Sequence, residues 1–219
     1  GLVCLQHEKP FEGINGSGKH NNWSFGTEDE NLLDPGDTPE ANLQFIVFLT
    51  CVIEAVDNYQ DLLRMSVASC GNDHRLGAHE APPAIISIFL GDELSSIIDA
   101  LTSGETAAHT LREQLDFGVD VLPNLERDTT DRNRTSPFAF TGNKFEFRMP
   151  GSSVNVSDAN TVLDTAVAKT LKEFADAMEA RGDMEFEHDA LDWVRKSLQA
   201  HKRILFSGDG YSEEWHAEA

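Results

Sequence analysis

The 219-residue sequence is poor in basic residues and has no long apolar run. Its 17 Lys and Arg residues stand against 38 Asp and Glu residues, which gives a formal net charge of -21. This charge argues against general binding to nucleic acid or anionic lipid, because both ligands attract clustered cations. The longest apolar stretch, residues 45–56, is shorter than the ~20 residues that cross a bilayer. We therefore expect no nucleic-acid partner and no membrane contact.

Cysteine is also scarce, with Cys4, Cys51 and Cys70 widely spaced and no CxxC pair. An odd number at such spacings is typical of reduced thiols rather than of a disulfide framework or a zinc site. The expected location is cytoplasmic, or an organelle if a transit peptide lies upstream. Because the sequence opens with Gly1 and residues 2–9 already read as a strand, we expect it to be part of a longer protein.

Hydrophobic periodicity predicts both helices and strands along the chain. A helix is expected from a Thr38 N-cap to about Arg64, with its apolar spacing loosening near Asn58 and Tyr59. Further helices are expected over residues 92–101, 158–181 and 188–201, and strands over residues 84–90 and 144–148. A composition change near residues 151–153 predicts a boundary between residues 1–150 and 151–219.

The glycine-rich turn at residues 13–18 is typical of a loop that approaches a ligand. Gly13, Gly18 and Lys19 match a phosphate-loop pattern, but His20 replaces its final Ser or Thr and residues 21–26 are poor in helix formers. An ordinary surface turn competes with this interpretation. A nucleotide hydrolase with a phosphate loop at residues 13–19 therefore stays open as an alternative. His20 is a candidate metal ligand only if other ligand side chains lie near it.

Residues 144–148 alternate between apolar and charged side chains. Lys144, Glu146 and Arg148 share one face, within a neighbourhood rich in phenylalanine where a charge requires a partner. Glu146 is therefore a candidate oxygen ligand for Mg²⁺ or Mn²⁺, and Arg148 a candidate clamp for a carboxylate or phosphate. The alternative is the solvated face of an edge strand.

Two further segments carry charged side chains in suggestive positions. In residues 75–83, flexible Gly77 precedes a stiff Pro-Pro pair and predicts a loop that carries Glu80 at its tip. Arg132 and Arg134 supply two forked donors shortly before the charged strand. The alternatives are a simple surface connection for the loop and pairing of both arginines with neighbouring aspartates.

Together these segments resemble glutamine synthetase, and the match is close to the type III branch of that family. Four motifs stand in the family's order: Asn15-Gly16-Ser17-Gly18-Lys19-His20, Arg75 with Glu80-Ala81-Pro82, Arg132-Asn133-Arg134-Thr135, and Lys144-Phe145-Glu146-Phe147-Arg148. Single motifs of this length arise by chance, whereas four in order do not. The amino-acid sequences of residues 7–11, 19–24, 136–143 and 211–215 are similar to type III. The resemblance spans essentially the whole chain.

The resemblance implies an α+β fold. Residues 1–150 would form the back half of the family's catalytic domain, an antiparallel β-sheet with flanking helices. Residues 151–219 would form a helical C-terminal region. The implied reaction is ATP-dependent ligation of ammonia to glutamate through γ-glutamyl phosphate, with Mg²⁺ or Mn²⁺ as cofactor. The implied partners are glutamate, ammonia, ATP and identical subunits in a homo-oligomeric ring.

The resemblance also assigns a role to each residue that matches a motif. Implied metal ligands are His20 and Glu146; implied glutamate contacts are Asn15, Gly16, Arg75 and Arg148; implied ATP or phosphate contacts are Ser24 and Arg134; implied catalytic residues are Glu80 and Arg134. Glu80 would take a proton from ammonium, and Arg134 would neutralise the transferring phosphoryl group.

Two positions depart from the common type of the family. Asn22 stands where that type has a second His, and Ala139 where it has an Arg. The acidic strands that supply most of the family's metal ligands lie upstream of Gly1, so we expect these 219 residues alone to be inactive. A non-catalytic acidic interaction domain is the third interpretation.

Overall fold

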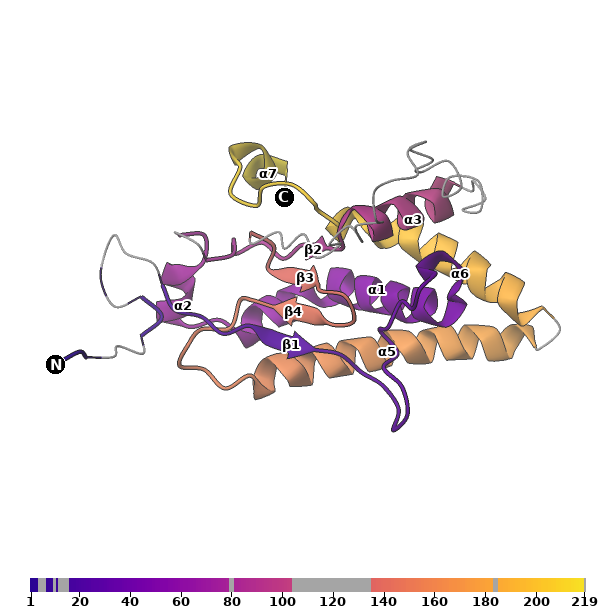
Figure 1. Cartoon of the computed structure of the whole chain (residues 1–219), viewed down its shortest axis with the longest axis horizontal. Coiled ribbons are helices and arrows are strands. Elements are labelled where there is room, and N and C mark those ends of the chain that lie inside the picture. The colour runs from indigo at the N-terminus through magenta and orange to yellow at the C-terminus, as the bar shows by residue number, and fades with distance from the viewer. Residues whose placement is uncertain are drawn as a thin grey trace, which may run out of the picture.

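The computed structural model describes residues 1–3, 7–9, 11, 16–78, 81–103, 135–182 and 185–218. These residues form a four-stranded sheet with flanking helices (Figure 1), so the expected α+β class is confirmed. The strands are β1 (Asn21–Trp23), β2 (Ile88–Phe89), β3 (Phe138–Phe140) and β4 (Phe145–Phe147). The helices are α1 (Leu43–Ser66), α2 (Cys70–Arg75), α3 (Asp92–Ser103), α5 (Ser157–Arg181), α6 (Phe186–His201) and α7 (Glu213–Glu218), with short 3₁₀ turns η1 (Pro39–Ala41) and η2 (Lys202–Ile204).

The strand order β1-β4-β3-β2 places β4 inside the sheet, between β1 and β3. Both neighbours run antiparallel to β4, as expected, while β2 joins β3 in parallel and makes the sheet mixed. The interior position of β4 contradicts the alternative that residues 144–148 form an edge strand.

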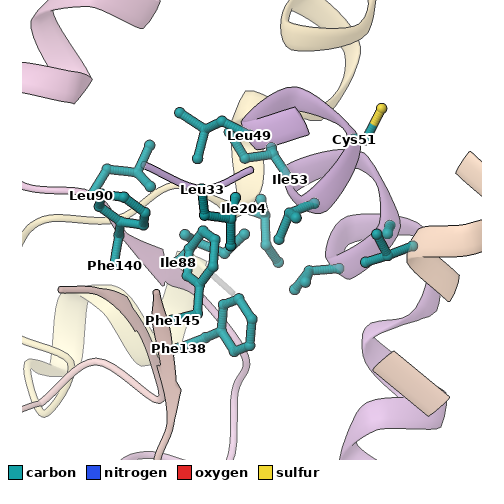
Figure 2. Packing of buried hydrophobic residues seen from close by; sticks show 14 of the residues in the cluster. Leu33, Leu49, Cys51, Ile53, Ile88, Leu90, Phe138, Phe140, Phe145 and Ile204 are labelled. Carbon is teal, nitrogen blue, oxygen red and sulfur yellow. The ribbon is translucent and has the colours of Figure 1, made fainter. Parts of the chain in front are cut away.

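One face of the sheet is built from phenylalanine. Phe138 and Phe140 on β3 lie opposite Phe147 and Phe145 on β4, and all four rings are buried. The ring centroids of Phe138 and Phe145 are 4.7 Å apart. Figure 2 shows Phe138 and Phe145 in the same cluster as Ile88 of β2 and Ile53 of α1. Burial of each such ring contributes about 1.5–3 kcal/mol, so this inner face anchors the strands to the helices.

The start of α1 differs from the expectation. Thr38 makes no side-chain cap, and the chain first forms the η1 turn. The cap is Asn42, whose Oδ1 accepts a hydrogen bond from the backbone N–H of Phe45 at 3.0 Å. The expected loosening is confirmed, because Tyr59 has non-helical dihedrals inside α1.

The two long helices that follow the sheet pack against α1 and against each other. α5 ends where Gly182 adopts a φ of 85°, a conformation that favours glycine and explains the expected stop. Figure 1 shows α5 running along β1. Two hydrogen bonds join them: Asn21 to Asn160 at 2.7 Å and Trp23 to Asp164 at 2.8 Å. The side of β1 that carries Asn21 and Trp23 therefore packs against α5.

Several other expectations require correction. The strand over residues 2–9 is absent from the described residues 2, 3 and 7–9, and the strand over residues 84–90 is reduced to β2. Sequence analysis missed α2, α7, β1 and β3. The two strands have three residues each and form through pairing rather than through local propensity.

Cys51 and Cys70 are free thiols, as expected, and Cys4 lies outside the described residues. Burial raises the pKa of the Cys51 thiol to about 12. Among the described helices, none has the length and apolar content needed to span a membrane.

Candidate active site

The outer face of the sheet, opposite the phenylalanines, carries the charged and polar side chains. Asn22 of β1 lies opposite Glu146 of β4, which lies opposite Ala139 of β3. His20 and Ser24 share the side of Asn22, since alternate residues of an extended chain face the same way. The side chains of His20, Asn22 and Ser24 are exposed, whereas Glu146 and Ala139 are buried.

His20 and Glu146 meet on this outer face. The distance from His20 Nδ1 to Glu146 Oε2 is 3.6 Å, and the side chains are 60% and 11% exposed. Two ligands at neighbouring corners of a Mg²⁺ octahedron lie about 3 Å apart, because each sits about 2.1 Å from the ion. A small rotation of the exposed imidazole would therefore bring both groups to the same cation. Among the described residues, no group of three or more His, Cys, Asp or Glu surrounds a metal position.

Arg148 holds the carboxylate of Glu146 in place. Its Nε and Nη2 both donate to Glu146 Oε2, at 3.2 and 3.1 Å, and its Nη1 donates to the backbone carbonyl of Ser136 at 3.2 Å. Arg148 is only 4% exposed, so the pair is largely shielded from water. The guanidinium thus neutralises a buried charge and orients it beside His20. Direct binding of a substrate carboxylate by Arg148 stays a prediction.

A β-bulge lies where the chain enters β1, next to the site. Gly18 pairs with Gly151, and the backbone N–H of Lys19 donates to the Pro150 carbonyl at 2.9 Å. Relative to the Asn21–Phe147 pair, the partner chain holds one extra residue here. The chain after Lys19 therefore continues into a strand, and Lys19 Nζ donates to the backbone carbonyl of residue 154. This path contradicts the phosphate-loop alternative, which requires a helix at that point.

Arg75 lies at the end of α2 and is only 3% exposed. Its Nε donates to Asn72 Oδ1 at 2.9 Å and its Nη2 to the Met149 carbonyl at 2.8 Å. A Cβ added at Gly16 would lie 2.3 Å from Arg75 Cγ, and one at Gly18 would lie 2.6 Å from Arg75 Nη1. The described glycines of the turn therefore make room for this arginine, and burial lowers the pKa of its guanidinium.

Glu8 is a site-supporting residue that sequence analysis missed. It is 8% exposed, and its Oε1 accepts hydrogen bonds from the backbone N–H of Ser153 at 3.1 Å and from the Ser153 hydroxyl. Its carbonyl accepts from the Ser17 N–H at 2.6 Å. The side-chain hydrogen bond from Ser153 is the main cause that lowers the pKa of Glu8. Nothing in the sequence around Glu8 signals this burial.

Asn72 was missed as well. Its Nδ2 donates to the carbonyls of Val67 and Met149, at 2.7 and 2.9 Å, so it joins α2 to the end of β4. Its position three residues before Arg75 places both side chains on one side of α2, which is the signal available in the sequence.

The structure thus brings the predicted site residues into two groups, one on the outer face of the sheet and one beside it. His20, Glu146 and Arg148 form the first, and Gly16 and Arg75 form the second at the bulged end of β1. Ser24 follows β1 at the other end of that strand. The remaining predicted residues lie outside the described residues: Asn15, Glu80 and Arg134.

Comparisons with known proteins agree with the motifs. The family model of the glutamine synthetase C-terminal domain matches residues 189–219. Over 217 residues the chain is 52% identical to the type-3 glutamine synthetase of Dictyostelium discoideum. It is 50% identical to the glutamine synthetase of Butyrivibrio fibrisolvens and 48% identical to that of Bacteroides fragilis. These alignments cover 98 to 100% of the chain but only 30 or 31% of each relative. The chain belongs to the glutamine synthetase family, and its sequence corresponds to a part of the type-3 members.

Proposed function

We propose that the protein containing this chain joins ammonia to glutamate in an ATP-dependent reaction that proceeds through γ-glutamyl phosphate. The names of the relatives support this activity. The observation that carries the proposal is the 3.6 Å approach of His20 to Glu146, with the Arg148 fork on the same carboxylate. An imidazole, a carboxylate and a guanidinium together are suited to a divalent cation and to the phosphate anion that it accompanies.

In this proposal His20 and Glu146 hold one Mg²⁺ or Mn²⁺ ion, which would supply positive charge to the ATP phosphates. Arg148 holds the Glu146 carboxylate in place, aimed at the ion. The buried Arg75 and the adjacent Gly16 belong to the glutamate pocket, together with Asn15.

Ser24 and Arg134 are proposed as contacts of the ATP phosphates. Glu80 is proposed as the group that takes a proton from ammonium before the acyl phosphate is attacked. The acyl phosphate must also be kept from water until ammonia arrives.

His20 and Glu146 supply two ligands, whereas Mg²⁺ takes six. The other ligands would come from water, from substrate or from residues beyond those that the structure describes. We propose that some of them belong to a part of the protein outside this chain, and that these 219 residues alone are inactive. The active protein is proposed to be a cytoplasmic homo-oligomeric ring. Residues 1–150 belong to its catalytic domain in this proposal, and residues 151–219 to its helical C-terminal region.

The test is made in the full-length protein, with Mn²⁺ binding and glutamine formation measured in parallel. His20→Ala and Glu146→Ala should each weaken Mn²⁺ binding by at least about tenfold and reduce glutamine formation, because each removes a proposed ligand. His188→Ala is a matched control, since this α6 imidazole is 77% exposed and is remote from the site in sequence.

Three results separate the interpretations. A wild-type protein that forms no glutamine from glutamate, ammonia and ATP would reject the proposed activity. An unchanged Mn²⁺ affinity in Glu146→Ala would favour the acidic interaction domain. Equal losses in His20→Ala and His188→Ala would show a general effect of removing a histidine.

A further inference from the structure

The C-terminal segment, residues 205–218, returns to the sheet after α6. Leu205 forms a parallel bridge with Ile88 of β2, and the Phe206 N–H donates to the Ile88 carbonyl at 2.9 Å. The Phe206 ring then stacks on Trp215, with centroids 4.0 Å apart and an interplanar angle of 15°. Figure 1 shows this segment leading from α6 to α7 beside β2. Two anchors therefore fix its path.

Between these anchors, Tyr211 reaches the loop that follows α2. Its hydroxyl donates to the Ala81 carbonyl at 2.5 Å. Ala81 is 4% exposed, and the Gly77 N–H donates to the Pro82 carbonyl at 2.8 Å, which closes the loop at its base. Ala81 directly follows Glu80 in the sequence. Tyr211 thus holds the described end of the segment that bears the proposed proton acceptor.

The neighbouring residue, Gly210, contacts a second segment of the site. Its N–H donates to Thr135 Oγ1 at 3.0 Å. A Cβ at Gly210 would lie 3.1 Å from the Thr135 carbonyl oxygen and 3.2 Å from Pro83 Cγ, so the backbone fits closely between them. Thr135 directly follows Arg134 in the sequence. Two consecutive residues therefore contact the two chain segments that lead to Glu80 and Arg134.

We propose that the C-terminal segment positions the active site, with Tyr211 as its main positioning residue and Gly210 as its second contact. This inference rests on the proposed function. A side chain that must meet a substrate atom depends on the backbone on either side of it, and small displacements there reduce the rate. Removal of the hydroxyl leaves the buried Ala81 carbonyl without this donor, so the loop base loosens while the phenyl ring keeps its packing.

The experiment uses Tyr211→Phe in the full-length protein. One hydrogen bond corresponds to a factor of roughly 3 to 10, so kcat for glutamine should fall by about that factor while KM for ATP is unchanged. The ADP formed per glutamine should rise, because a misplaced proton acceptor leaves more time for water to attack the acyl phosphate. Hydrogen exchange at the Gly77 amide, read from a peptide covering residues 76–83, should accelerate by a similar factor.

Tyr59→Phe is the matched control, because the sequence has two tyrosines and Tyr59 lies in α1. It should leave all four quantities unchanged. Gly210→Ala should loosen the same loop through Pro83 and lower kcat in the same direction.

Unchanged exchange at Gly77 in Tyr211→Phe would overturn the proposed contact, whatever the activity. Faster exchange with an unchanged kcat and an unchanged ratio of ADP to glutamine would overturn the positioning role. Failure of the proposed function is seen separately, as a wild-type protein that forms no glutamine.

Discussion

Replacement of Arg148 by Gln should destabilise the fold far more than the loss of an ordinary ion pair. Arg148 and Glu146 are 4% and 11% exposed at their side chains, so the substitution leaves a carboxylate with little access to water. Loss of one partner of a buried pair costs about 3–5 kcal/mol, and the Ser136 carbonyl loses its donor as well. Because Gln retains one donor group, we expect a loss near the lower limit, about 3 kcal/mol.

A matched pair on α1 and α2 isolates the effect of burial. Arg64 Nη2 lies 2.6 Å from Asp73 Oδ1, a shorter contact than that of Arg148, but these side chains are 29% and 49% exposed. Exposed pairs contribute only about 0.2–1 kcal/mol. Arg64→Gln should therefore cost less than 1 kcal/mol, although it removes the same type of side chain.

The assay is urea unfolding followed by tryptophan fluorescence. With an m-value of about 2–3 kcal/mol/M, Arg148→Gln should lower the midpoint by about 1 to 1.5 M and Arg64→Gln by less than about 0.5 M. Adding Glu146→Gln to Arg148→Gln should recover part of the loss, because it removes the unpaired charge. Equal shifts for the two arginines, or no recovery in the double variant, would refute the reasoning.

Three further changes test the surroundings of the site. Gly18→Ala should destabilise the fold by about 1–3 kcal/mol in urea unfolding, because its Cβ would press on the buried Arg75 guanidinium and displace its charged hydrogen bonds. The hydrogen bond from Ser153 lowers the pKa of Glu8, so this group stabilises the fold above its unfolded pKa and ceases to do so as pH falls through its folded pKa. The stability difference between wild type and Glu8→Gln should therefore be present at pH 7 and shrink as the pH falls below about 4.3, the usual pKa of a Glu side chain. Asn42→Ala should cost about 1 kcal/mol in thermal unfolding through loss of the α1 cap, and an unchanged Tm would contradict that role.

The parts of the fold that sequence analysis predicted well have local causes. Alternation around Phe145 and Phe147 was visible because one side of β4 packs into the core and the other does not. The end of α5 was visible because Gly182 adopts a positive φ. The irregularity at Tyr59 was visible because the apolar spacing of α1 changes there.

The parts that were missed have distant causes. β1 and β3 have three residues each and exist because they pair with β4, which lies far from β1 in the sequence. Asn42 replaces Thr38 as the cap because a 3₁₀ turn intervenes, and the sequence pattern fits both positions. Propensity cannot distinguish such cases without the tertiary contacts.

The candidate site shows the same division. The residue types of His20, Glu146 and Arg148 and their motifs were visible in the sequence, but their mutual geometry depends on the pairing of β1 with β4. The partners of Arg75 were unpredictable, since they are backbone carbonyls at the end of β4 and a side chain of α2.

Asn22, Glu146 and Ala139 form a row across the outer face of the sheet. This row contains both positions that depart from the common type of the family. Asn22 and Ala139 flank Glu146 on the adjacent strands, so both altered positions adjoin the same carboxylate. Neither side chain carries a charge, and within this row the negative charge of Glu146 is therefore not offset by a neighbour on β1 or β3. The compensation comes along β4 instead, from the fork of Arg148. A divalent cation that approaches Glu146 consequently meets neutral groups in this row, at Asn22 and at Ala139.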